Sequence, residues 1–211
     1  EMKTENNLII SNIKEKPIKT DFVMAKKVYE FLATGFEDIE ALIPLDIMRR
    51  AGVDFKTVSV TGNRMVESAH GVAIQADLLF EEADLKDADL LMLPGGLPGA
   101  TNLNDHVGVR RALLEQNKEG KLIAAICAAP MVPGALGLLS GKRATCYPGF
   151  EKYMEGADYT HELFTVDGNI ITGEGPAATL PYAYALLAML TDRNTADGIA
   201  EGMMYKHLML K

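Results

Sequence analysis

Hydrophobic and polar positions along the chain form short blocks that predict strands and helices in alternation. Patterns typical of strands occupy residues 28–34, 54–60, 71–77, 89–96 and 121–127, and residues 163–173 contain the hairpin signal Val-Asp-Gly-Asn. Patterns typical of helices occupy residues 38–52, 104–120, 180–191 and 195–210, and a short or kinked helix is expected at 128–141, which carries two prolines. This alternation predicts a single three-layer α/β domain with a mainly parallel sheet.

In two of these segments the sequence also indicates where a helix begins and ends and how deeply a strand is buried. The helix at 38–52 has Asp38 near its start, two arginines in its last turn and Gly52 as its C-cap. Pro44 is expected within or near its first turns, because proline is poorly tolerated further inside a helix. The strand at 121–127 is apolar on both faces, as expected at the centre of a parallel sheet.

Length and composition indicate one globular domain. A chain of 211 residues suits one substantial core. Residues 1–23 are polar and without periodicity, and we interpret them as an N-terminal extension without a catalytic role, ahead of a domain at 24–211. The run at 8–10 is too short for a secretory signal.

Charge and cysteine content narrow the classes of partner. The formal net charge of −8 argues against nucleic acid as a stable partner and against an anionic membrane surface. No apolar run approaches the roughly 20 residues that span a bilayer. Two cysteines cannot form a disulfide scaffold or a structural zinc cluster, and no metal-ligand spacing occurs, so we expect reduced thiols, no metal and a cytoplasmic location.

The candidate chemistry lies where three predicted strands end. Their ends read TGFEDIE, LPGGLPGA and AICAAP, and ligands bind at the carboxyl ends of strands in such sheets. Cys127 is expected at a strand-to-helix turn, where helix amides lower a thiol pKa. Amides of the PGG turn and of Ala128 would form an oxyanion hole, and an acid of the first loop would share a proton with the sulfur. Taken singly, these features also fit a buried structural cysteine, an ordinary turn and a solvated helix start.

Taken together, four motifs resemble the ThiJ/PfpI superfamily, and within it the branch of the parkinsonism-associated protein deglycase. They are GFEDIEALIPLDIMRRAGV, LPGGLPGA, AAICAAP and GEGPAAT, in unbroken order from about residue 27 to about residue 190. The resemblance implies a flavodoxin-like fold of the class I glutamine amidotransferase type, a homodimer and no cofactor. It also implies a nucleophile at Cys127, a proton-sharing acid at Glu40, oxyanion-hole amides from Gly96 and Ala128, and a turn shaped by Gly95.

One position departs from the family pattern. Many members have a histidine close to the cysteine after the next strand, whereas this chain has Tyr147 there, preceded by Cys146. Tyr147 is expected to orient a ligand, to donate a proton or simply to line the pocket, together with Pro176. Cys146 is either buried or a resolving thiol. His70 either lines the pocket or dimer edge, or lies in a solvated loop.

Local sequence separates this chain from other branches of the superfamily. Ala128 follows the nucleophile where the PfpI-type proteases have a histidine, which argues against peptidase activity. Glu174 has Thr172 two places before it, so the His-x-Glu of the glutamine amidotransferases is missing. The glycine-rich stretches at 137–143 and 173–178 fail as phosphate or dinucleotide motifs, because their spacing or their position in the chain is wrong.

Two functions follow from the resemblance. In the first, the protein is a cofactor-free glyoxalase or deglycase in stress defence, whose substrate is the small aldehyde methylglyoxal or a group glycated by it. In the second, it is a redox-sensing, chaperone-like stress protein in which Cys127 is oxidised without turnover. Both functions need the same residues, so the sequence leaves them open. With tyrosine in place of the histidine, we expect reduced turnover.

Overall fold

A seven-stranded sheet forms the centre of the computed structural model, which describes residues 25–209. Its order is β10-β11-β7-β6-β1-β2-β5. The strands are β1 (Lys27–Leu32), β2 (Asp54–Ser59), β5 (Leu78–Leu79), β6 (Leu90–Leu93), β7 (Leu122–Ile126), β10 (Phe164–Asp167) and β11 (Ile170–Gly173). All neighbours pair in parallel except β10 and β11. The predicted parallel sheet and the apolar central strand β7 are confirmed.

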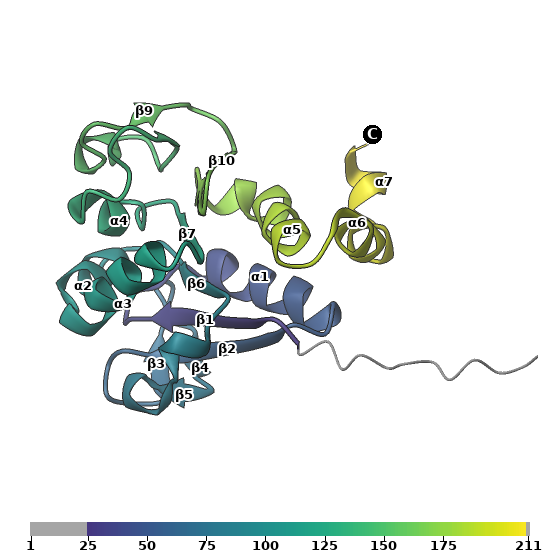
Figure 1. Ribbon diagram of the computed structural model, residues 1–211. Helices are drawn as coiled ribbons and strands as arrows, with labels where there is room; N and C mark the ends of the chain where they lie inside the picture. Colours follow the sequence, from purple (N-terminus) through teal and green to yellow (C-terminus); the bar gives the residue numbers. More distant parts are fainter. Residues whose placement is uncertain (1–24, 210–211) are drawn as a thin grey trace, which may run out of the picture.

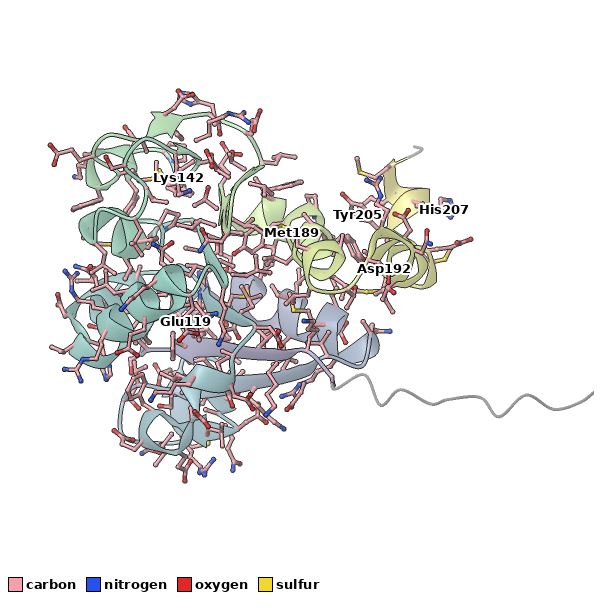
Figure 2. All side chains as sticks on the ribbon, viewed as in Figure 1. Glu119, Lys142, Met189, Asp192, Tyr205 and His207 are labelled. Carbon is pink, nitrogen blue, oxygen red and sulfur yellow. The ribbon has the colours of Figure 1, made fainter. Side chains whose placement is uncertain are left out.

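Helices cover both faces of the sheet, which completes the expected three layers (Figure 1). One layer contains α1 (Asp38–Arg50), α5 (Thr179–Leu190) and α6 (Arg193–Gly202), and the other contains α2 (Gly99–Asp105), α3 (Val107–Lys118) and α4 (Met131–Ala135). The last helix, α7 (Tyr205–Met209), follows α6. The Tyr205 ring, labelled in Figure 2, lies 4.9 Å from the Tyr184 ring of α5, so α7 is held against this layer.

One predicted strand belongs to a different sheet. Within residues 71–77, only β4 (Ala73–Gln75) is a strand, and it pairs antiparallel with β3 (Met65–Glu67) outside the main sheet. The edge of the main sheet is formed instead by β5, which directly follows residues 71–77 in the chain. Alternating polarity does not distinguish a hairpin from a sheet edge, since both bury one face. A second small sheet pairs β8 (Arg143–Ala144) with β9 (Asp158–Tyr159).

Three helix predictions need correction. The helix expected at 104–120 is two helices, because the His106 ring accepts the amide hydrogen of Val109 at 3.1 Å and so caps a new helix. The helix expected at 195–210 ends at Gly202, and Met204 takes a φ of +61° before α7; residue 210 lies outside the described residues. Pro44 lies well inside α1, which begins at Asp38.

The hairpin prediction is confirmed. Strands β10 and β11 are joined by a two-residue turn in which Gly168 has a φ of +61°. The predicted N-terminal extension, residues 1–23, lies outside the described residues. Among the described helices, none is long and apolar enough to cross a membrane.

Candidate active site

The three chemically unusual strand ends meet at one edge of the sheet. Strands β1, β6 and β7 are neighbours and run parallel, so the segments that follow them emerge side by side. These segments carry Glu40 in the first turn of α1, Gly95 and Gly96 in the loop after β6, and Cys127 directly after β7. The sheet therefore brings together the residues that the sequence selected.

Cys127 has a strained backbone at the turn that follows β7. Its φ is +63°, a left-handed conformation that is uncommon for a residue with a side chain. Its amide donates a 2.9 Å hydrogen bond to the carbonyl of Gly173, and its carbonyl accepts the amide hydrogen of Tyr147 at 2.9 Å. These bonds hold the strained residue from both sides. Sharp strand-to-helix turns of this kind present a nucleophile at the top of a sheet.

Two glycines allow the loop after β6 to approach the cysteine. A Cβ built on Gly95 would lie 2.7 Å from the Cβ of Cys127 and 2.7 Å from Oε2 of Glu40. Gly96 has a φ of +85°, and a Cβ there would lie 2.5 Å from the amide nitrogen of Glu37. Neither position has room for a side chain. The backbone amides of Gly96 and Ala128 consequently reach the Cys127 sulfur, where their hydrogen bonds favour the thiolate.

Glu40 is a buried carboxyl within hydrogen-bonding reach of the Cys127 thiol. Its Oε2 accepts the amide hydrogen of Gly95 at 2.9 Å. Glu37 caps α1 by accepting the amide hydrogen of Glu40 at 2.8 Å, which fixes the first turn. Burial, followed by the charge of Glu37, raises the pKa of Glu40 to about 7, whereas the Cys127 contact and the Gly95 amide act in the opposite direction. Glu40 is thus poised to gain and lose a proton near neutral pH.

The expected lowering of the thiol pKa is wrong. Burial, and then the charge of Glu40, raises the pKa of Cys127 to about 12, and the two amides offset this only in part. The helix expected to favour thiolate is α4, which starts at Met131 and is five residues long, so its dipole is small. The side chain of Cys127 is also buried, at 8% exposure. The thiol therefore needs a neighbouring base, and Glu40 is in place to be that base.

Tyr147 lies next to Cys127 through the backbone hydrogen bond described above. Its side chain is 48% exposed, and a Cβ built on Gly175 would lie 3.3 Å from its ring. Pro176 follows as the first residue of a short 3-10 turn (Pro176–Ala178) and is half-buried. Cys146 is fully buried, and burial is the main cause that raises its thiol pKa to about 12. This burial fits the structural interpretation of Cys146 rather than a resolving thiol.

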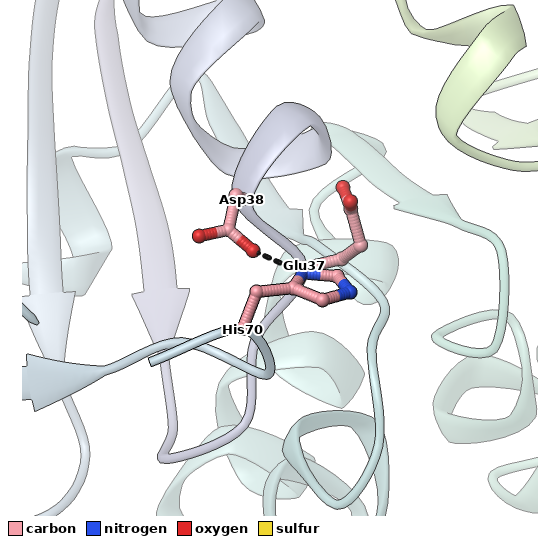
Figure 3. A group of neighbouring side chains, drawn as sticks. All are labelled: Glu37, Asp38 and His70. Carbon is pink, nitrogen blue, oxygen red and sulfur yellow. Dashed lines mark hydrogen bonds and ion pairs between the residues drawn. The ribbon is translucent and has the colours of Figure 1, made fainter. Parts of the chain in front are cut away.

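His70 is an exposed residue in the loop between β3 and β4. Its Nδ1 lies 2.6 Å from Oδ2 of Asp38, the first residue of α1, and Figure 3 shows Glu37 beside this pair. The hydrogen bond to Asp38 raises the pKa of His70. Burial opposes a charge on Asp38, but hydrogen bonds from Ser68 and His70 outweigh it and lower the Asp38 pKa. Sequence reasoning missed the pairing, because nothing local joins residues 32 positions apart.

The same three side chains are a group whose ligand atoms could hold a metal ion. Their carboxylate and imidazole atoms lie within 4.8 Å of one another. Existing bonds account for the arrangement, however, because Asp38 binds both His70 and Ser68 and Glu37 caps α1. The side chain of His70 is 68% exposed, which fits the solvated-loop interpretation.

The fold and the site together define a class. They place the chain among α/β proteins that present a cysteine at a strained strand-to-helix turn, with a carboxyl and backbone amides around the sulfur. The model of the DJ-1/PfpI family matches residues 26–189, and the chain belongs to that family. Its neighbours of known structure share the flavodoxin-like fold.

Similarity to individual proteins extends over most of the domain. Protein DJ-1 homolog B of Arabidopsis thaliana is 38% identical over 173 residues, which are 81% of this chain and 40% of that protein. A deglycase of Pyrococcus horikoshii is 31% identical over 160 residues, 72% of this chain and 91% of the relative. The structure of oxidized Toxoplasma gondii DJ-1 superposes with a TM-score of 0.82 at 33% identity, covering 85% of this chain and 98% of that one. The chain spans less than half the length of the Arabidopsis relatives.

Proposed function

We propose that this protein is a cofactor-free glyoxalase or deglycase that acts on methylglyoxal or on groups glycated by it, in stress defence. The observation that carries the proposal is the contact between the Cys127 thiol and the Glu40 carboxyl, whose pKa is raised to about 7. A base with a pKa near the working pH is the most effective general base. Above that pH the pair holds one proton, which moves between sulfur and carboxyl.

The reaction begins when the Cys127 sulfur adds to the aldehyde carbon. Glu40 takes the thiol proton as the carbon–sulfur bond forms, and the amides of Gly96 and Ala128 face the oxygen that becomes negative. Glu40 returns that proton to this oxygen, which completes the hemithioacetal. Glu40 then takes the proton from the former aldehyde carbon and delivers it to the neighbouring carbon, while the hydroxyl proton passes to the ketone oxygen, which yields a thioester of lactate. Water then releases lactate and regenerates the thiol, so no external oxidant or reductant is consumed.

Relatives add support from outside the structure. The Pyrococcus horikoshii protein is named a deglycase, and the match spans 91% of its length at 31% identity. The family match, residues 26–189, includes both Cys127 and Glu40. We extend the activity to this chain because its own residues provide a nucleophile, a base and two amides for that chemistry.

The test is lactate formation from methylglyoxal by purified protein in buffer free of added thiols. Wild type should form lactate, Cys127→Ser should form none above background, and Glu40→Gln should be slowed by about 100-fold or more, which is the range for loss of a general base. A wild type without lactate formation, or a Cys127→Ser variant with an undiminished rate, would overturn the proposal.

A second candidate function is redox sensing, favoured by the carboxyl beside the thiol. Two peroxide molecules would convert the Cys127 thiol into a sulfinate and be reduced to water, and the carboxyl of Glu40, when protonated, would donate a hydrogen bond to the sulfinate. The structure described as oxidized is that of Toxoplasma gondii DJ-1. Cys127 is slightly exposed, whereas Cys146 is fully buried. After mild peroxide treatment, peptide mass spectrometry should find two added oxygens at Cys127 first; earlier oxidation of Cys146 would count against a sensor.

A homodimer and a cytoplasmic location also remain proposals. The region around the start of α1 and the β3–β4 hairpin exposes apolar side chains that a second copy would cover: Ile39, Leu42, Met65 and Val72. Light scattering of the purified chain tests the homodimer, and a mass of one chain at micromolar concentration would contradict the homodimer.

A further inference from the structure

The last helix, α7, is short and is attached to the domain mainly through one aromatic side chain. It is five residues long, and none of the side chains of Tyr205–Met209 is buried. Tyr205 is its anchor, since its ring lies 4.9 Å from the ring of Tyr184 on α5 and is tilted from it by 47°. Tyr184 itself is buried. A helix of this length is not stable alone, so its position depends on this ring contact.

Met203 lies at the joint between α6 and α7, where it contacts the same tyrosine. It is the C-cap of α6, and its side chain is partly buried against the core. The Tyr184 hydroxyl donates a hydrogen bond to the Met203 sulfur at 3.5 Å. Tyr184 therefore contacts Tyr205 through its ring and Met203 through its hydroxyl. A chemical change at the sulfur consequently acts on the residue that holds α7 in place.

The next residue, Met204, contributes to α7 through its backbone. It has a φ of +61°, and its carbonyl accepts the amide hydrogens of His207 at 3.1 Å and of Leu208 at 3.2 Å. Its side chain, in contrast, is 61% exposed. Oxidation of an exposed side chain disturbs little packing. Met204 is therefore a matched comparison for Met203, because the two residues are adjacent in the chain and differ in burial.

We propose that Met203 is a site of oxidative modification that controls the attachment of α7: its sulfoxide displaces Tyr184 from Tyr205 and releases the helix. The oxidant is hydrogen peroxide. The sulfur lone pair forms a bond to one peroxide oxygen as the O–O bond breaks, and the other oxygen leaves as water with both hydrogens. The sulfur is oxidised by two electrons and the peroxide is reduced. The proposal goes beyond the proposed function, since it needs neither Cys127 nor turnover.

The added oxygen changes both the size and the polarity of the methionine side chain. Sulfoxidation converts a flexible apolar group into a polar one. At Met203 the new oxygen needs space in a partly buried position, where the Tyr184 hydroxyl already lies 3.5 Å from the sulfur. The hydroxyl must move to accommodate the oxygen, and the Tyr184 ring moves with it, which weakens the contact with Tyr205. Because methionine sulfoxide is reduced by dedicated reductases, the release of α7 is reversible.

The test is tryptic cleavage after Lys206, which lies within α7 and is cut faster when the helix is released. Hydrogen peroxide should speed this cleavage in wild type by about fivefold or more, the effect expected from loss of an aromatic pair. Intact-mass spectrometry detects the loss of residues 207–211, and peptide fragmentation assigns the sulfoxide to Met203 or Met204. Cleavage after Lys152, in a 3-10 turn that packs against α4, is the internal reference and should not change.

Two substitutions at position 203 separate modification from general damage. Met203→Leu keeps an apolar side chain of similar volume and forms no sulfoxide, so peroxide should leave its cleavage rate unchanged. Met203→Gln places a polar group at the same position and should be cut faster than wild type without peroxide. Met204→Leu is the matched control and should behave like wild type, with acceleration by peroxide.

The remaining measurements identify the cause of the acceleration. Circular dichroism establishes that each variant is folded. Methionine sulfoxide reductases of both stereospecificities should restore slow cleavage of the oxidised wild type. The acceleration should persist in Cys127→Ser, so a failure of the glyoxalase or deglycase activity would leave this result distinct. Equal acceleration by peroxide in Met203→Leu and wild type, or slow cleavage of wild type whose Met203 is oxidised, would overturn the proposal.

Discussion

Gly95 lies so close to Cys127 that a Cβ on the glycine would be 2.7 Å from the Cβ of the cysteine. The same added atom would be 2.7 Å from Oε2 of Glu40 and 2.9 Å from the carbonyl of Ile126. The missing side chain therefore sets the distance between the loop after β6 and the strand end of β7. It also lets the Gly95 amide reach the Glu40 carboxyl at 2.9 Å.

Gly95→Ala should consequently damage the site more than the fold. The added methyl must displace either the cysteine or the carboxyl, at a cost in the free energy of unfolding of about 1–3 kcal/mol, and lactate formation should fall below detection. Gly198→Ala is the control, because a Cβ at this helical position meets nothing within 4 Å. It should stabilise the protein by up to about 1 kcal/mol and leave the rate unchanged. Wild-type activity in Gly95→Ala would contradict the close approach.

The raised pKa of Glu40 predicts a stability that falls as pH rises. Between the ordinary glutamate pKa near 4.5 and the folded value near 7, the native state keeps a proton that the unfolded state has lost. Stability is therefore highest below the unfolded pKa and declines until the pH has passed the folded pKa. The shift corresponds to at most about 3 kcal/mol.

Glu40→Gln cannot titrate and should lack this decline. Urea unfolding at about pH 5 and about pH 8 measures the free energy of unfolding of both proteins. The advantage of the variant, which is its free energy of unfolding minus that of wild type, should be larger at the higher pH. Comparing the two proteins cancels the contributions of the other titrating groups. An advantage that does not grow with pH would show that the folded-state pKa of Glu40 is not raised.

Tyr147 offers a test of the position where the family has a histidine. Its ring is half-exposed, and its backbone amide is already bonded to the carbonyl of Cys127, so a new side chain there should leave the fold intact. Tyr147→His adds a group that titrates near neutral pH at a position bonded to Cys127 through the backbone, and it should raise kcat for lactate formation by about tenfold or more. Tyr147→Phe keeps the aromatic wall and should match wild type. Equal rates in the two variants would mean that position 147 takes no part in proton transfer.

The sequence predicts the sheet and the central pair of the site for identifiable reasons. The apolar run that ends at Cys127 predicts a central strand, because a strand that is buried on both faces has no polar positions. The rule that chemistry gathers at the carboxyl ends of neighbouring strands indicates an acid of the first loop and the amides of the PGG turn, and the family resemblance selects Glu40 and Gly96 among them. These predictions depend on local pattern and on strand order, which the alternation of elements constrains.

The sequence does not predict the features that depend on how deeply a side chain is buried. Glu30 stands in the run VYEFLAT as a polar position between apolar ones, which is also the pattern of a half-exposed strand. In the folded chain it is a fully buried acid, on the same strand face as Leu32, which packs with Ala41 of α1. The sequence also predicts a lowered pKa for Cys127, and this prediction is wrong for the same reason. Burial and the nearby carboxyl raise the pKa by more than the amides lower it.

The pH dependence of kcat/KM for lactate formation from methylglyoxal tests the central claim most directly. If Glu40 is the base that takes the proton of Cys127, kcat/KM of wild type rises with pH, reaches half its maximum near pH 7 and then levels off, because only the ionised carboxyl accepts a proton. Glu40→Gln should be slow, with no inflection near that pH. A wild-type profile that is flat through pH 7, or an inflection that persists in Glu40→Gln, would contradict the account.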